Sequence, residues 1–199
     1  MRSRTRRRTV VTFAASLVVA APAASPPVAA VDLHKSRLTN IELSKCKRLT
    51  RHKDGGSWRC PGLRGYPVYF AEGDLRHFLA FGPRPEKRRS ATQTIGPFND
   101  IFRGSRRSAV EWRIERYPDG REVPYATIVR YATARDGEKG EALVITKVDA
   151  QDSCHLAIVD ARATPDAMAL ARTWANTEAR KRPCPDVPEQ LGVIGRDPL

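Results

Sequence analysis

Alternation of apolar and polar residues dominates the second half of the chain and predicts β-strands. Along 109–116 the residues Val110, Trp112 and Ile114 alternate with charged ones, which is the two-residue period of a strand with one buried face. We therefore expect the charged residues of this strand to face solvent. Turn sequences such as YPDGRE and RDGEKG separate it from three further strand-like runs, at 123–133, 141–149 and 154–161. Short strands joined by tight turns favour an antiparallel meander over a parallel sheet.

A second strand signal lies in the first half of the chain. Residues 66–72 and 75–81 are rich in aromatic and apolar side chains, and only Gly73 and Asp74 separate them. A two-residue connection containing glycine is typical of a tight β-hairpin. If Glu72 pairs with Leu75, one face of the hairpin collects five large apolar side chains, which would stabilise the sheet: Tyr66, Val68, Phe70, Leu79 and Phe81.

Helical periodicity is strongest near the C-terminus. Residues 165–181 predict a helix with Thr164 as N-cap and Pro165 at the first helical position. Its sheet-facing side chains would be Ala167, Leu170, Ala171 and Trp174. Shorter helical turns are expected within 39–46 and after Pro85, the latter inside a long connection over 83–107. The pattern thus predicts an α+β fold: an antiparallel sheet of about five to seven strands with a C-terminal helix packed on one face.

The first thirty residues predict a secretory signal peptide. Five arginines and no acidic residue precede an apolar run, and small residues follow at cleavage points after Ala23 or Ala30. A membrane anchor would need about twenty apolar residues, and Pro22 ends this run early. We expect a flexible segment at 31–39, one exported domain at 40–190 and a C-terminal tail at 191–199. No other segment reads as a transmembrane span, and the expected location is periplasmic or secreted.

If the protein is exported, its four cysteines are expected to form disulfides. An even number of cysteines in an oxidising compartment predicts disulfides. Zinc binding is the alternative, but the chain has no C-x-x-C pair, so we expect neither a metal nor a cofactor. A strand from Cys154 to residue 161 and a helix folded back along it have similar lengths, which would bring Cys184 beside Cys154. Of three conceivable pairings, this favours Cys154–Cys184 with Cys46–Cys60.

Positive charge is concentrated in two segments. The chain carries a net charge of +13, and +8 remains after residues 1–30 are removed. Residues 45–64 contribute +6 and residues 84–107 contribute +5. If the fold brought both segments to one side, the surface would attract anions, although the charge could equally serve solubility alone. The candidate anion-binding residues are Lys45, Lys47, Arg48, Arg51, Lys53, Arg88, Arg89, Arg106 and Arg107.

Catalytic chemistry has little support in the sequence. Glu72 and Asp74 flank a hairpin tip, where neither carboxylate is desolvated as an acid–base pair requires. The chain contains no G-x-S-x-G, H-E-x-x-H or glycine-rich phosphate-loop motif. We therefore assign no catalytic residues. A dispersed hydrolase site around His77, Glu72 or His155 is kept as an alternative.

Several stretches taken together resemble a family of small exported bacterial proteins that has no assigned activity. They are GGSWRCPGLRGYPVYFAEGDLR, VEWRIER, ATIVRY, LVITKV and CHLAIVDA, followed by a helix that begins with PDA. The resemblance covers most of residues 40–190. It implies export and an α+β domain with two disulfides, and it carries no catalytic residues across.

The expected function is that of a non-catalytic binding or interaction protein of the bacterial envelope. Its partner would be an anionic envelope component or an acidic protein, and a nucleic acid is not expected because no nucleic-acid motif is present. The alternatives are a small periplasmic hydrolase and an inhibitor of a secreted hydrolase.

Overall fold

The larger of two sheets contains seven strands within the described residues. The computed structural model describes residues 34–103 and 107–193 of the chain, so the expected signal peptide lies outside them. The sheet has the order β1-β7-β8-β9-β10-β11, and the short β6 pairs with the second half of β8. Only β10 and β11 pair in parallel, so the sheet is mixed. Its strands are β1 (His34–Glu42), β6 (Phe98–Asp100), β7 (Arg107–Arg116), β8 (Glu122–Arg135), β9 (Glu138–Lys147), β10 (His155–Asp160) and β11 (Glu189–Leu191).

The second sheet is an antiparallel meander of four strands in sequence order. Its strands are β2 (Lys47–His52), β3 (Gly55–Leu63), β4 (Tyr66–Gly73) and β5 (Arg76–Phe81). A short 3₁₀ turn, η1 (Leu43–Lys45), connects β1 to β2, and η2 (Pro85–Lys87) and η3 (Arg89–Ala91) follow β5. The helical turn expected after Pro85 is therefore present, whereas that expected over 39–46 is limited to η1.

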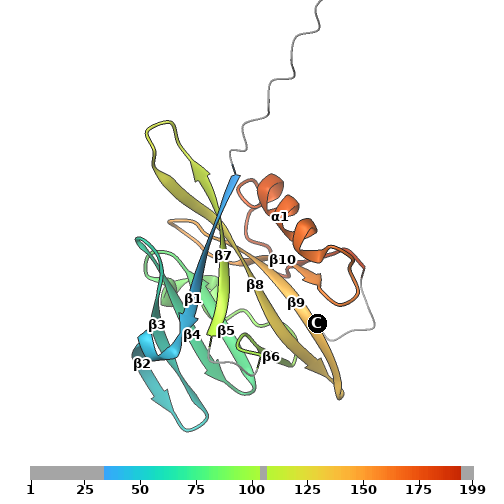
Figure 1. Ribbon diagram of the computed structural model, residues 1–199. Helices are drawn as coiled ribbons and strands as arrows, with labels where there is room; N and C mark the ends of the chain where they lie inside the picture. The colour runs from blue at the N-terminus through green and yellow to red at the C-terminus, as the bar shows by residue number, and fades with distance from the viewer. Residues whose placement is uncertain (1–33, 104–106, 194–199) are drawn as a thin grey trace, which may run out of the picture. The chain divides into compact units, whose positions relative to one another are not determined.

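Two apolar cores lie on opposite faces of the larger sheet. One, which includes Trp112 and Tyr131, is shared with the four-stranded sheet. The other, which includes Leu143 and Leu156, is covered by helix α1 (Ala167–Glu178). Figure 1 shows α1 lying along the larger sheet, on the side away from β2–β5. The α+β class is confirmed, and so is a C-terminal helix on one face, although the strands form two sheets rather than one.

The hairpin of β4 and β5 has a register two residues away from the predicted one. Glu72 pairs with His77 rather than with Leu75. The turn is made by Asp74 and Leu75, both of which have positive φ, at 51° and 62°, as a primed turn requires. Because side chains alternate with a period of two, a shift by two residues keeps the same apolar side chains on the buried face.

Three expected boundaries were wrong. The segment predicted to be flexible, 31–39, contributes most of β1, which is held by pairing along β7. At the other end, β11 crosses the expected domain limit at residue 190 and adds to β10. The helix begins at Ala167 rather than at Pro165, with Asp166 before it at a positive φ of 51°, and the hydroxyl of Thr164 accepts a hydrogen bond from the backbone N–H of Val193.

The predicted disulfides are both present, Cys46–Cys60 and Cys154–Cys184, and the described residues contain no free cysteine. Disulfides form and persist in oxidising compartments. The two bridges therefore indicate a protein that folds outside the cytoplasm. Within the described residues, no helix is long and apolar enough to cross a membrane.

Candidate functional site

Strand β2 and the turn after it present a group of exposed basic residues. This strand is the terminal one of the four-stranded sheet, and all six of its residues are exposed. Lys47, Arg48 and Arg51 lie in the strand, and Lys53 follows in the turn to β3. Among the described residues, no carboxylate forms an ion pair with any of these four. We call this group, Lys47–Arg48–Arg51–Lys53, the basic edge.

The basic edge is held in place from its inner side. The Cys46–Cys60 bridge joins the residue before β2 to the middle of β3, and Cys60 is buried. The guanidinium of Arg48 lies 5.4 Å from the centre of the Trp58 ring, a cation–π contact. The hydroxyls of Thr50 and Ser57 are 2.7 Å apart across the same pair of strands. The strand is therefore ordered although its side chains lie in solvent.

In the second basic segment, Arg88 and Arg89 form hydrogen bonds with the protein's own backbone. Arg88 donates hydrogen bonds to the carbonyls of Pro83 and Ala150 at 2.7 Å, and also to that of Gln151. Arg89 donates to the carbonyl of Cys184 at 3.3 Å. These guanidinium groups fasten loops together, and the structure does not bring them to the basic edge.

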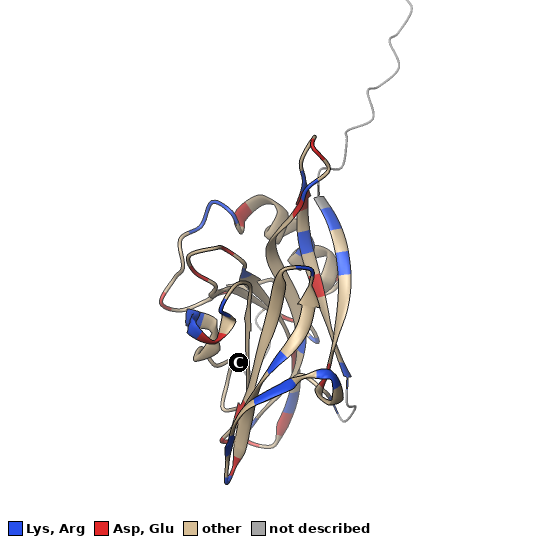
Figure 2. Ribbon diagram, turned by 90° about the vertical axis from the view of Figure 1, so that its left-hand side faces the viewer, with Lys and Arg blue, Asp and Glu red and all other residues tan. Residues whose placement is uncertain are grey.

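Glu42 is the point where the two basic segments meet. Lys45 lies 3.0 Å and Arg107 lies 3.7 Å from its carboxylate oxygens. The hydrogen bond from Lys45, assisted by the charge of Arg107, lowers the pKa of Glu42. Arg106, the remaining candidate, lies outside the described residues. The sequence left open whether the two segments share one face. In the described residues they contribute the basic edge and separate positive groups, and Figure 2 shows blue segments in several places with red ones between them.

His77 and Glu72, two residues of the alternative hydrolase site, do lie close together. Nε2 of His77 is 3.9 Å from the Glu72 carboxylate, and Nδ1 is 3.3 Å from Asp100. However, Nδ1 accepts a hydrogen bond from the backbone N–H of Ile101 at 3.1 Å. The lone pair that a general base needs is therefore occupied. Burial lowers the pKa of His77 despite the two nearby acids, so the neutral ring acts as a structural acceptor that fixes the segment after β6.

His155 also has a structural role. It is buried in β10, and its Nδ1 lies 2.9 Å from the hydroxyl of Thr146. Burial lowers its pKa to about 4. It lies in the larger sheet, whereas His77 lies in the smaller one. Neither histidine is arranged as a catalytic base, and the described residues contain no cluster of three His, Cys, Asp or Glu that could hold a metal ion.

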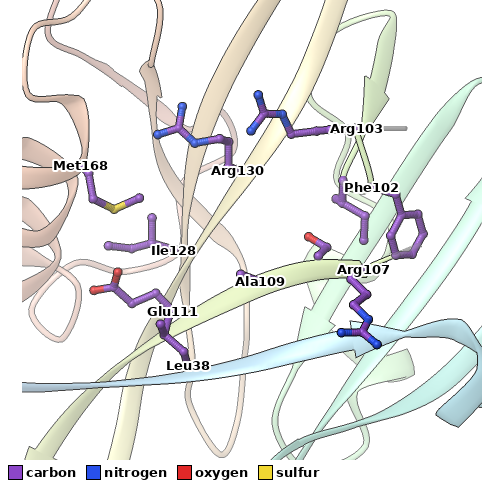
Figure 3. Close-up of a pocket in the computed structure, with 11 residues that line it drawn as sticks. Leu38, Phe102, Arg103, Arg107, Ala109, Glu111, Ile128, Arg130 and Met168 are labelled. Carbon is purple, nitrogen blue, oxygen red and sulfur yellow. The ribbon is translucent and has the colours of Figure 1, made fainter. Parts of the chain in front are cut away.

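A hollow of 490 Å³ lies between the start of α1 and the segment that follows β6. Figure 3 shows Met168 and Ile128 at one end, Phe102 at the other, and Arg103 and Arg130 along one side. Its residues come from β1, β7, β8, α1 and the segment after β6. No pattern in the sequence indicates this hollow, because five segments far apart in the chain form it and none carries a motif.

Buried charges next to this hollow are the second feature that the sequence did not predict. Glu111 and Arg113, expected to face solvent, are each only 5% exposed because α1 covers their side of β7. Glu111 accepts two hydrogen bonds of 2.8 Å from Arg172, and it also binds Arg113 at 3.1 Å and Ser36 at 2.8 Å. These partners outweigh the effect of burial and lower the pKa of Glu111.

In comparisons with known proteins, no family model, no curated protein and no solved structure matches this chain. The resemblance to small exported proteins therefore stays a prediction, and function has to be inferred from the site itself.

Proposed function

We propose that this protein is an exported, non-catalytic binding protein that engages an acidic protein partner through the basic edge. The observation that carries the proposal is a terminal strand whose residues are all exposed, together with the four bases of the basic edge, none of which has an acidic partner among the described residues. Export is supported by the signal-like N-terminus and by the two disulfides.

Two physical features of the basic edge favour an extended acidic segment as the partner. A terminal strand offers backbone N–H and C=O groups to an added strand, and alternate side chains can then add specificity. Lysine and arginine on such a strand discourage pairing between copies of the same protein, because like charges repel. The same charges attract a strand rich in Asp or Glu. The backbone of the edge would therefore provide the pairing, and its side-chain charges would select an acidic partner.

The proposal can be tested with a labelled twelve-residue peptide that alternates glutamate with threonine or valine. The full-length oxidised protein should bind it, and raising the salt concentration from about 50 to about 300 mM should weaken binding because salt screens exposed charges. The double variant Lys47→Glu/Arg51→Glu should bind about tenfold more weakly or worse. Lys181→Glu, a charge reversal at an exposed lysine just beyond α1, is the matched control and should bind normally.

A second peptide separates strand addition from simple charge attraction. Methylation of alternate backbone nitrogens keeps every carboxylate but removes the N–H groups that pair with an edge strand. The proposal predicts that this peptide binds much more weakly than its parent. Equal binding of both peptides, or equal binding to vesicles of phosphatidylglycerol, would instead indicate a general affinity for anions and would overturn the choice of an acidic protein as partner.

A further inference from the structure

The hollow beside the start of α1 combines an apolar wall with positive charge, and none of its residues belongs to the basic edge. Apolar side chains make up most of its surface: Leu38, Ile101, Phe102, Ala109, Ile128 and Met168. Leu38 is 71% exposed, so its side chain is open to a ligand that enters the hollow. The volume of 490 Å³ falls within the range of about 300–1,000 Å³ common for small-molecule sites.

The positive charge comes from two arginines that share one carboxylate. Arg103 and Arg130 both pair with Glu141, Arg130 at 2.7 Å. Two guanidinium groups against one carboxylate leave an excess charge of one unit. Their side chains are 46% and 34% exposed, and each guanidinium has five N–H donors, of which the contacts with Glu141 use only some. The pair can therefore donate hydrogen bonds to a second carboxylate or to a phosphate.

The acidic residue on the opposite wall does not cancel this charge. Glu111 lines the hollow, but Arg172 and Arg113 already neutralise it. Arg107, also in the lining, lies close to Glu42. In Figure 3 the guanidinium groups of Arg103 and Arg130 lie on one side of the apolar end formed by Ile128 and Met168. The field of the hollow is thus positive on the arginine side and uncharged along the apolar side.

We propose that this hollow binds a small amphipathic anion, whose carboxylate or phosphate is held by Arg103 and Arg130 and whose apolar part lies against Leu38, Ile128 and Met168. Arg103 also lines a neighbouring hollow of 730 Å³. Arg103 therefore lies at the boundary between two spaces, and an anion bound to it has room to extend either way. The site is independent of the acidic partner assigned to β2.

Calorimetric titration of the full-length oxidised protein with three matched probes tests this inference: decanoate, decylamine and decanol. They share one alkyl chain and differ in charge. Decanoate should bind about tenfold or more tightly than either of the others, because only decanoate brings a negative charge to the two guanidinium groups. Equal binding of decylamine, or no binding of decanoate, would overturn the proposal.

Two variants locate the site. Arg103→Gln/Arg130→Gln should reduce decanoate binding about tenfold and leave decanol binding unchanged. Ala109→Leu should weaken both probes, because the larger side chain takes up part of the hollow. Lys181→Gln is the control. Decanoate binding that survives the double variant would contradict the assignment, and so would binding that survives Ala109→Leu. Unchanged binding of the acidic peptide by both variants would show that the two sites are separate, so one proposal can fail without the other.

Discussion

Replacing Glu111 by alanine is the sharpest test of the packing between α1 and the larger sheet. The carboxylate is 5% exposed and binds two arginines that differ greatly in burial. The side chain of Arg113 is 7% exposed, whereas that of Arg172 is 49% exposed. Loss of Glu111 therefore leaves one guanidinium buried without its counter-charge and releases the other into solvent.

The magnitude follows from the buried partner. Removing one member of a buried ion pair destabilises a protein by about 3–5 kcal/mol, because the remaining charge stays desolvated. Arg113 keeps its hydrogen bonds to Asn176, at 2.8 and 3.1 Å, so the lower half of that range applies, about 3–4 kcal/mol. In a domain of this size that corresponds to a fall in melting temperature of about 6–16 °C. Arg172→Ala should cost less than Glu111→Ala, because Glu111 keeps its hydrogen bonds with Arg113 and Ser36.

Urea denaturation of the oxidised protein measures these differences, and a double variant gives the decisive comparison. In Glu111→Ala/Arg113→Met no buried charge is left unpaired, so this protein should be more stable than Glu111→Ala alone. The control is Arg121→Ala, which removes an exposed arginine paired with Asp119 and should change stability by less than about 0.5 kcal/mol. A loss below about 1 kcal/mol in Glu111→Ala, or a double variant that loses the sum of both single effects, would refute the reasoning.

Three further results are expected. Serine at Cys46 and Cys60, whose bridge closes a loop of 14 residues, should lower the free energy of unfolding by about 3 kcal/mol in denaturant titrations; an unchanged midpoint would contradict this. Because burial lowers the pKa of His155 to about 4, the unfolded chain binds more protons below about pH 6.5, and stability should fall by about 3 kcal/mol between pH 6.5 and 4; His155→Gln should flatten this fall, and an equally steep profile in the variant would disprove it. His77→Phe removes the acceptor for the Ile101 N–H and should cost about 1–3 kcal/mol, with faster hydrogen exchange at that amide; unchanged exchange would show that the bond is not needed.

Local patterns in the sequence predicted those parts of the fold that depend on neighbouring residues. The alternation around Trp112 identifies β7 and its buried face, and the comparable lengths of a strand and a helix were enough to pair Cys154 with Cys184. The hairpin of β4 and β5 was placed correctly, but its register was not. Turn geometry decides the register, and a leucine with positive φ at position 75 is not what turn preferences predict.

The remaining features depend on contacts between distant segments. Glu111 and Arg113 read as the solvent side of a strand, because the pattern does not reveal that a helix about sixty residues later covers them. Arg88 reads as part of a basic surface, although loop carbonyls near Ala150 use its donors. A charge count along the chain therefore overestimates the basic surface, and β2 is one part of it whose bases form no ion pair within the described residues.

The central claim is that β2 is the edge on which a partner strand adds. Hydrogen–deuterium exchange, measured residue by residue with and without the acidic peptide, tests it most directly. An added strand would protect backbone amides on the open side of Lys47–His52, with no comparable change at α1 or at β11. Protection that appears elsewhere, or binding without any protection in β2, would contradict the claim.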